Sequence, residues 1–370
     1  MQFFRSGGFD IKKRAQVLGM LTQAHKGLCV AGTHGKTTTS TLLAHIYKDS
    51  GAGCSAFLGG ISKNYDTNLL ISDNPVIVAE ADELDRSFLQ LFPSVAVIEA
   101  MDADHLDIYV DVEHVREAFR AFASQVSDTL IIKYGLPIGK EDSRARILSY
   151  SYDRKEADFH AENIVRDELG CLHFDLVYPE GRIENMHCGT PGWVNVENSV
   201  AAAAVALCGG IAPEAIRKAV ASFQGVKRRF DIHFNRPGCT YIDDYAHHPK
   251  ELSSTIRAIR EVYPGRKICA IFQPHLYTRT RDFADEFAEA LSAVDKLILL
   301  DIYPARELPI PGVSSEMILG KVKCPEKLLL HKEELMDYLK KEPLDILVSF
   351  GAGDIDRFIV PISKMLEERN

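Results

Sequence analysis

The residues best suited to chemistry lie in a short stretch near the start of the chain. An apolar run, Leu28 to Ala31, precedes Gly32-Thr33-His34-Gly35-Lys36-Thr37, and apolar residues at helical spacing follow. This order predicts a strand, a glycine turn and a helix whose backbone N–H groups bind phosphate oxygens. We expect Lys36 to neutralise the β- and γ-phosphates and the Thr37 hydroxyl to ligate Mg²⁺. The stretch therefore predicts a nucleoside triphosphate site rather than a plain strand-to-helix turn.

Acidic residues follow two further predicted strands. The apolar runs 76–79 and 95–98 end in Glu80-Ala81-Asp82-Glu83 and in the acids between 102 and 107. Ligands of open α/β sheets bind beyond the carboxyl ends of the strands, so these acids are expected to gather around the phosphates. Glu80 is expected either to complete a Mg²⁺ site with Thr37 or to be a solvated acid at a helix N-terminus. His105, which stands between Asp104 and Asp107, is expected near the phosphates, with a second metal as one candidate partner.

Charged and aromatic residues gather again in the second half, at the ends of two more predicted strands. Asp243-Asp244-Tyr245-Ala246-His247-His248-Pro249 follows one strand, and the segment 273–281, which contains Arg279 and Arg281, follows the next. Arginine side chains there are suited to binding a substrate carboxylate. The triplet Lys227-Arg228-Arg229 is either a solvated basic run or the source of an arginine that stabilises a transferring phosphoryl group.

The elements that must position these residues form two α/β patterns. Strands and helices alternate up to about residue 150, an antiparallel hairpin is expected around 172–178, and an alanine-rich helix over 195–206. A second α/β pattern begins near Val226, so we place the domain boundary at the Gln224-Gly225-Val226 turn, which gives domains 1–225 and 226–370. The predicted fold class is α/β: an ATPase domain of P-loop type with a mixed sheet, then a Rossmann-like domain.

Composition narrows the class of protein. A chain of 370 residues is long enough for two or three domains, and its net charge of -9 argues against a nucleic-acid partner. No apolar run of membrane-spanning length and no basic-then-apolar leader stand out. The eight cysteines are scattered, without a Cys-x-x-Cys pair or a histidine at zinc spacing, which favours a reducing compartment. We expect a cytoplasmic protein that has no nucleic-acid partner and does not insert into a membrane.

Taken together, these motifs resemble those of the Mur ligase family, ATP-dependent enzymes that build the peptide stem of bacterial cell-wall precursors. The segment 32–39 resembles the phosphate loop of the family, and 80–83 and 104–107 resemble its two acidic motifs. The segments 244–249, 273–275 and 278–281 are similar to those of the branch that adds L-alanine. The likeness runs over almost the whole chain. It implies an amide ligase in peptidoglycan precursor synthesis that uses ATP and Mg²⁺ to join L-alanine to UDP-N-acetylmuramate through an acyl phosphate.

The resemblance also implies roles for single residues. Lys36, His105 and Arg229 would be catalytic, and Thr37, Glu80 and His105 would be the metal ligands. Tyr245, His247 and Arg279 would face the incoming amino acid. The implied nucleotide contacts comprise the phosphate loop, two asparagines as adenine neighbours and two residues of the second domain: Gly32, Thr33, His34, Gly35, Lys36, Thr37, Thr38, Asn195, Asn198, Arg229 and Asp244.

Three departures from the family pattern bear on these roles. Val194 stands where the family usually has histidine, and Leu276 stands where an arginine commonly precedes the tyrosine. Family members also begin with a uridine-nucleotide-binding domain, whereas this chain reaches its phosphate loop by residue 32. We therefore expect that domain to be missing and the chain to be weakly active. The alternatives are a nucleotide-binding module without ligase activity and another Mur or folylpolyglutamate-type ligase.

Overall fold

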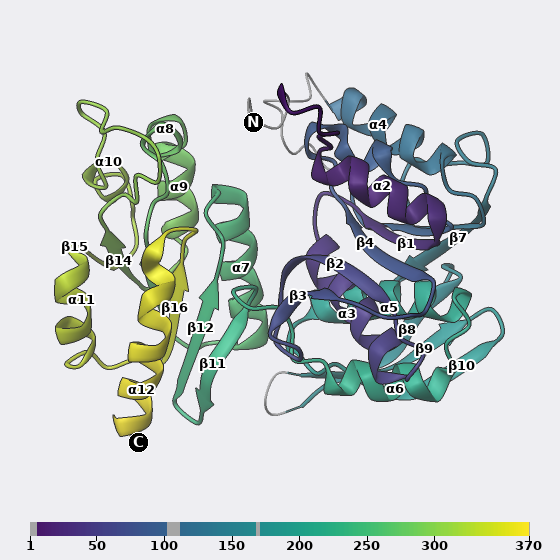
Figure 1. Cartoon of the computed structure of the whole chain (residues 1–370). Helices are drawn as coiled ribbons and strands as arrows, with labels where there is room; N and C mark the ends of the chain where they lie inside the picture. Colours follow the sequence, from purple (N-terminus) through teal and green to yellow (C-terminus); the bar gives the residue numbers. More distant parts are fainter. Residues whose placement is uncertain (1–5, 102–111, 168–170, 370) are drawn as a thin grey trace. The chain divides into compact units, whose positions relative to one another are not determined.

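The structure is a computed structural model that describes residues 6–101, 112–167 and 171–369. The chain divides into two compact units, Met1–Lys227 and Arg228–Asn370. The boundary expected from the sequence, at Gln224-Gly225-Val226, lies just before this division. The described residues of each unit form one sheet with helices packed on it (Figure 1).

The described part of the first unit is built on a ten-stranded mixed sheet with the order β10-β9-β8-β7-β6-β5-β1-β4-β2-β3. Its central strands from β7 to β2 are parallel, whereas β3, β9 and β10 pair antiparallel with their neighbours. In chain order the strands are β1 (Lys26–Ala31), β2 (Ser55–Ser62), β3 (Thr67–Leu70), β4 (Val76–Ala81), β5 (Val95–Ile98), β6 (Thr129–Lys133), β7 (Arg146–Ser151), β8 (Phe159–Arg166), β9 (Leu172–Tyr178) and β10 (Gly181–His187).

Strand β1 lies at the centre of this sheet and is buried on both faces. Its side chains alternate between two cores, Leu28 and Val30 facing one and Cys29 and Ala31 the other. A continuous apolar run is what a parallel strand covered on both faces requires. The helical elements of the unit are α2 (Arg14–Ala24), α3 (Lys36–Asp49), η1 (Leu84–Gln90), α4 (Val112–Ser124), α5 (Trp193–Cys208) and α6 (Pro213–Ser222).

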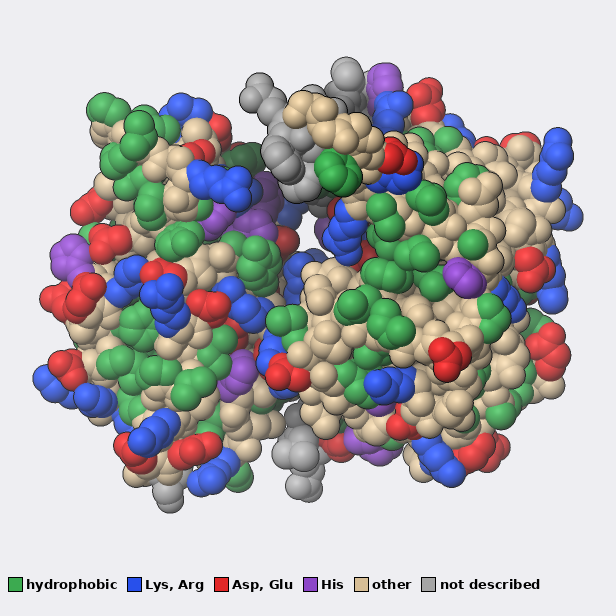
Figure 2. Space-filling view, viewed as in Figure 1, with side chains coloured by type: hydrophobic (Ala, Val, Ile, Leu, Met, Phe, Trp, Pro, Cys, Tyr) green, Lys and Arg blue, Asp and Glu red, His purple; other side chains and the backbone are tan. Residues whose placement is uncertain are grey.

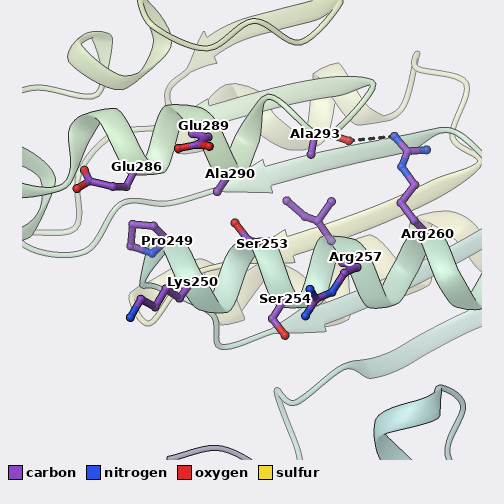
Figure 3. A pocket seen from close by; sticks show the side chains of 11 residues that line it. Pro249, Lys250, Ser253, Ser254, Arg257, Arg260, Glu286, Glu289, Ala290 and Ala293 are labelled. Carbon is purple, nitrogen blue, oxygen red and sulfur yellow. Dashed lines mark hydrogen bonds between the residues drawn. The ribbon is translucent and has the colours of Figure 1, made fainter. Parts of the chain in front are cut away.

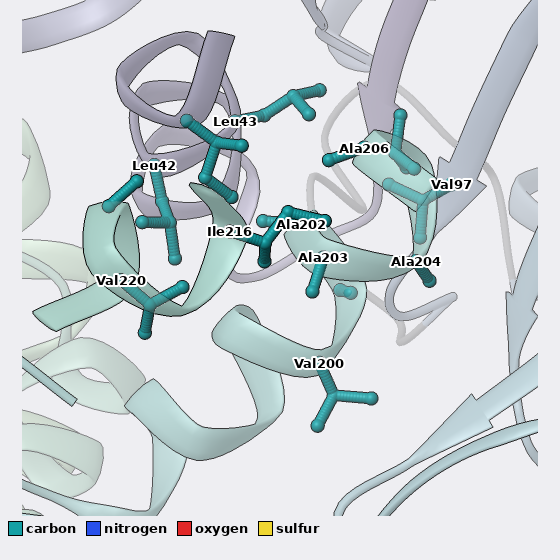
Figure 4. Close-up of a cluster of buried hydrophobic side chains, with 14 of the residues drawn as sticks. Leu42, Leu43, Val97, Val200, Ala202, Ala203, Ala204, Ala206, Ile216 and Val220 are labelled. Carbon is teal, nitrogen blue, oxygen red and sulfur yellow. The ribbon is translucent and has the colours of Figure 1, made fainter. Parts of the chain in front are cut away.

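The first core packs α3, α5 and α6 against one face of the sheet (Figure 4). Small side chains line α5, where the whole run from Ala201 to Ala204 is inaccessible to solvent. Short side chains allow α5 to approach α3 closely, with Leu42 and Leu43 of α3 packed in the same core. The second core packs α2, η1 and α4 on the opposite face, with Phe88 stacked on Phe122.

The second unit contains a six-stranded sheet with the order β11-β12-β16-β13-β14-β15, parallel except for β11. Its strands are β11 (Asp231–Arg236), β12 (Cys239–Asp244), β13 (Ile268–Phe272), β14 (Lys296–Leu300), β15 (Glu326–Leu330) and β16 (Ile346–Phe350). Its helical elements are α7 (Pro249–Val262), α8 (Tyr277–Asp282), α9 (Ala284–Leu291), α10 (Glu316–Leu319), α11 (Lys332–Leu339), η2 (Asp354–Phe358) and α12 (Ile359–Arg369).

The predicted α/β class is confirmed: the first sheet is mixed and the second, in the other unit, is largely parallel. The strands expected at 28–31, 76–79 and 95–98 are β1, β4 and β5, and the alanine-rich helix is α5. The expected hairpin is the antiparallel pair β8 and β9, whose connecting residues 168–170 lie outside the described part.

The surface of the second unit mixes charges of both signs. On the face seen in Figure 2, its Lys and Arg side chains are interspersed with Asp and Glu. Within the described residues, no helix has both the length and the apolar character that crossing a membrane would demand.

Candidate active site

The phosphate loop connects β1 to α3 at the carboxyl edge of the first sheet. Because β1 lies between β4 and β5, the residues that follow all three strands meet at this edge. Gly32 and Gly35 both have positive φ angles, of 144° and 84°. A Cβ atom at Gly32 would stand 2.9 Å from the backbone nitrogen of Ala100, so only glycine fits this close approach. The turn therefore requires both glycines for its backbone path.

The N-terminus of α3 presents backbone donors at the end of this turn. The amide of Thr39 donates to the carbonyl of Gly35 at 3.0 Å, which is the first hydrogen bond of the helix. The amides of Lys36, Thr37 and Thr38 precede that bond and therefore have no acceptor within the helix. Gly35 provides no capping side chain. This arrangement, together with the helix dipole, suits an anion such as a phosphate.

The other two loop residues differ in exposure. Thr33 is buried, and its amide donates to the carbonyl of Ala100 at 3.1 Å, which ties the loop to the end of β5. His34 is exposed at the tip of the turn.

Lys36 is held by a partner that the sequence did not single out. Its ammonium donates to the Gly32 carbonyl at 2.6 Å and to the carboxylate of Glu83 at 2.8 and 3.1 Å. The side chain of Glu83 is only 1% exposed, and that of Lys36 is 13% exposed. The lysine is therefore a half-buried member of an ion pair, fixed above the loop. The acidic run that follows β4 was the sequence signal for this contact.

Thr37 and Glu80 meet, as the sequence predicted for a shared Mg²⁺ site. The Thr37 hydroxyl donates to Oε1 of Glu80 at 3.0 Å. Glu80 lies in β4 beside Val30 of β1, so the strand register brings it to the phosphate loop. Hydroxyl and carboxylate oxygens are hard donors of the kind that Mg²⁺ takes, so the residues present fit this ion. His105, Asp104 and Asp107 lie outside the described residues.

Glu99 is a buried acid beneath the loop that sequence reasoning missed. It follows β5, is 5% exposed, and its Oε1 accepts a hydrogen bond from the Thr39 hydroxyl at 2.5 Å. A Cβ atom at Gly35 would stand 2.6 Å from its Oε2. Burial raises the pKa of Glu99 to about 8, and the Thr39 hydrogen bond offsets only part of that rise. The carboxyl group is therefore largely protonated at neutral pH and packs directly against the turn.

The two predicted adenine neighbours lie in the first two turns of α5. Asn198 is buried, and its Oδ1 would be 3.2 Å from a Cβ atom at Gly35, so it lies against the phosphate loop. Asn195 donates from its side chain to the Pro191 carbonyl at 2.6 Å. The structure thus brings Asn198 to the loop, while Asn195 anchors the start of its helix.

In the second unit, Arg228 and Arg229 differ in surroundings. Arg228 donates to the buried carboxylate of Asp243 at 3.1 Å and also bonds the Gly351 carbonyl. Arg229 is exposed, with its guanidinium 5.6 Å from the ring centre of Tyr245. Arg228 therefore stabilises the fold of the unit, whereas the guanidinium of Arg229 is exposed at the surface.

Asp244 supports the backbone around this basic pair. Its carboxylate accepts hydrogen bonds from the amides of Phe230 at 2.7 Å and Ala246 at 2.9 Å. Burial raises its pKa to about 6, against the lowering effect of those two amides. Asp244 is the last residue of β12, and these hydrogen bonds hold the segment that contains Tyr245 and His247.

Four side chains from the two motifs of the second unit form one cluster. The ring of His247 lies 5.1 Å from that of Tyr245 and 6.1 Å from that of His275, and Arg279 approaches Nδ1 of His275 at 3.4 Å. Burial lowers the pKa of both His247 and His275, and the Arg279 guanidinium lowers each further. Both imidazoles are therefore mainly neutral at pH 7. His275 belongs to a predicted motif but was not expected as a site residue.

Leu276, between these motifs, has an unusual backbone. Its φ of 73° is rare for a residue with a branched side chain. The amide of Leu276 donates to the Tyr303 carbonyl at 3.0 Å, and Thr280 donates back to the Leu276 carbonyl. These hydrogen bonds hold the strained residue that leads into α8, and strain of this kind tends to occur at functional sites.

A separate groove of about 750 Å³ lies in the second unit between α7 and α9 (Figure 3). Charged side chains on both helices line it, and Arg260 donates to the Ala293 carbonyl at its end. This groove is not lined by any of the predicted site residues that the structure describes.

Comparisons with known proteins identify both units. Residues 30–206 match the Mur ligase middle domain, and residues 228–353 match the Mur ligase glutamate ligase domain. A UDP-N-acetylmuramate–L-alanine ligase of Parabacteroides distasonis is 51% identical over 370 residues, which is 99% of this chain and 80% of that protein. The ligase of the same name from Flavobacterium psychrophilum is 47% identical over 99% of this chain and 80% of its own length.

Solved structures agree with these matches. A UDP-N-acetylmuramate–alanine ligase of Thermotoga maritima superposes with a TM-score of 0.77 at 26% identity, covering all of this chain and 81% of that one. A folylpolyglutamate synthase of the same organism reaches a TM-score of 0.71 at 14% identity, covering 97% of this chain and 96% of its own. At 14% identity, the similarity to the folylpolyglutamate synthase shows a shared fold and nothing more.

Proposed function

The chain belongs to the Mur ligase family, and on that premise we propose that it is an ATP-dependent ligase that joins L-alanine to UDP-N-acetylmuramate. The observation that carries the proposal is the similarity to alanine-adding relatives along 99% of the chain, at 51% identity. The phosphate loop in the first unit and the cluster around Arg279 in the second support it, because a ligase of this kind needs an anion site and a carboxylate site. The eight free thiols of the described structure support the cytoplasm as its compartment.

The proposed reaction has two steps. The lactyl carboxylate attacks the γ-phosphorus of ATP, forming an acyl phosphate and releasing ADP. The amine of L-alanine then attacks the acyl carbon, loses a proton, and expels inorganic phosphate to leave the amide. Lys36 and the amides at the start of α3 would offset the charge on the transferring phosphoryl group, a contribution that is mainly electrostatic and depends on positioned groups.

Other roles are proposed on the resemblance and on local chemistry. Mg²⁺, when bound, would neutralise phosphate charge, with Thr37, Glu80 and His105 as its proposed ligands. Arg279 would bind the carboxylate of L-alanine, while Tyr245 and His247 shape its pocket. The proposed nucleotide contacts outside the loop are Asn195, Asn198, Arg229 and Asp244.

The test measures phosphate release by the purified chain with ATP and Mg²⁺. We expect release that needs both UDP-N-acetylmuramate and L-alanine and that matches the amount of amide formed. D-Alanine and L-glutamate serve as control amino acids and should give little release. Phosphate release that is the same without L-alanine would instead indicate an ATPase, and ATP binding without any turnover would indicate a nucleotide-binding module.

A further inference from the structure

Four potential metal ligands meet at the antiparallel edge of the first sheet, far along the chain from the phosphate loop. They are Asp167, which follows β8, Cys171 and His173 at the start of β9, and His187 at the end of β10 (Figure 1). We propose that these four residues bind one divalent transition-metal ion of the zinc class. No role in the proposed ligase reaction depends on them.

The strand register brings the four residues together. In the β9–β10 hairpin His173 lies directly opposite His187, and their rings stack with centres 4.4 Å apart. The amide of Asp167 donates to the Cys171 carbonyl, and the amide of Cys171 donates to Oδ1 of Asp167, both at 2.9 Å. These two hydrogen bonds fix Asp167 and Cys171 beside the histidine pair.

The distances between the ligand atoms suit a shared ion. Oδ2 of Asp167 is 3.7 Å from Nε2 of His187 and 3.8 Å from Nε2 of His173, which is too long for a hydrogen bond. A tetrahedral zinc ion with bonds of about 2.0–2.3 Å separates its ligand atoms by about 3.3–3.8 Å. One donor atom each from Asp167, Cys171 and His187 lies within 4.8 Å of the others. These three donors need little movement to reach one ion, whereas the ring of His173, which is stacked on that of His187, has to turn to join them.

His187 adds an independent observation. Its Nε2 atom is buried and makes no hydrogen bond within the described structure. Buried polar atoms are nearly always satisfied, so this nitrogen calls for a partner. It lies within the cluster, 3.7 Å from Oδ2 of Asp167. A metal ion bound at this position would give the His187 nitrogen a partner.

The types of ligand select the kind of metal. A thiolate and two imidazoles are soft or borderline donors that suit Zn²⁺ and disfavour Mg²⁺, which takes oxygen ligands. One carboxylate and one thiolate would balance the two charges of the ion. A set of four protein ligands is typical of a structural site, so the ion would join β8, β9 and β10 at the end of the sheet.

The test titrates Co²⁺ alone into the metal-free full chain under reducing conditions, with Mg²⁺ in excess to occupy sites made of oxygen ligands. We expect one equivalent to produce the visible bands of tetrahedral cobalt and a thiolate-to-cobalt charge-transfer band, and Zn²⁺ to displace it. Cys171→Ser should abolish the charge-transfer band. His187→Gln should weaken binding by more than about 10–100-fold, the loss that follows removal of a merely supporting residue.

Cys208→Ser is the matched control, because Cys208 is also a half-buried thiol of the same unit but lies outside the cluster. It should leave both the bands and the affinity unchanged. Circular dichroism of each metal-free variant checks that the fold persists. The proposal is wrong if the native chain shows no charge-transfer band, or if Cys171→Ser keeps it.

Discussion

At the scale of single residues, Arg279 is the best candidate for recognition of the amino acid. A charge-assisted hydrogen bond to a carboxylate contributes about 1.5–3 kcal/mol, so Arg279→Ala should raise the KM for L-alanine roughly 10–100-fold. The KM for ATP should change little. Steady-state kinetics with each substrate varied in turn provides the measurement.

Arg281 provides the control for that variant. It lies on the same helix, and its guanidinium pairs with the neighbouring exposed Asp282. Arg281→Ala should therefore leave both constants close to those of the native chain. Equal rises in both constants for Arg279→Ala would assign that residue to folding rather than to amino-acid binding.

Lys36 affects both nucleotide binding and stability. Lys36→Ala should abolish measurable ATP binding in a calorimetric titration, because the phosphate loop loses its charge. It also removes the ammonium that faces the buried carboxylate of Glu83, so the variant should be less stable by about 1–3 kcal/mol. The double variant Lys36→Ala with Glu83→Gln should regain most of that stability without regaining ATP binding. A double variant that binds ATP would contradict the assignment of the loop.

Glu99 should make the stability of the protein depend on pH. Its pKa is about 8 in the folded chain against an ordinary value of 4.5, so the folded state binds more protons between those values. Stability from this group is therefore lost as pH rises from about 4.5 to about 8, by about 1.4 kcal/mol per unit of pKa difference. Glu197, Lys36 and Lys133 are the charged groups whose fields act on it.

Glu99→Gln removes this titration and keeps an acceptor for the Thr39 hydroxyl. Its melting temperature should exceed that of the native chain at pH 8.5, and the difference should shrink toward pH 5. Glu214→Gln is a suitable control, since Glu214 is an exposed acid whose pKa is lowered by Arg217. Parallel pH profiles for the native chain and Glu99→Gln would show that the carboxyl is ionised when buried.

At the scale of elements, the close packing of α5 positions Asn198 against the phosphate loop. Ala203 is fully buried in the core shared by α3, α5 and α6 (Figure 4). Ala203→Leu should destabilise the protein by about 1–3 kcal/mol, because a packed core has no room for extra methylene groups. Val194→Leu, at a position of the same helix that is 51% exposed, should have almost no effect. Urea denaturation compares the two; equal stability would mean that α5 is loosely packed.

At the scale of the whole molecule, each unit has hydrophobic cores of its own. Phe122 belongs to a core of the first unit and Phe287 to a core of the second. We predict two calorimetric unfolding transitions. Phe122→Ala should lower the first unit's transition and Phe287→Ala the other's, each by the equivalent of about 3–5 kcal/mol. If both variants shift one common transition, the units unfold together.

The sequence by itself determined the class of fold, the strand, glycine turn and helix start around residues 28–37, and the family. These features depend on local order along the chain: an apolar run, two glycines, a lysine and a hydroxyl specify a strand, a turn and a helix N-terminus. The meeting of Thr37 with Glu80 was also predictable, because acids that follow parallel strands share one edge of the sheet. The separate roles of Arg228 and Arg229 were not, since neighbours in a basic triplet differ only in what they contact.

Only the tertiary structure decided the contacts between segments distant in sequence. The burial of Glu99 beneath Gly35 depends on how closely β5 approaches the turn, and the Lys36–Glu83 pair depends on the backbone after β4. The cluster around Cys171 likewise could not be predicted from the sequence alone. No spacing of cysteines and histidines in the chain suggested a metal site, yet hairpin register places His187 opposite His173. Register depends on which strands pair, and that is decided by packing of the whole sheet.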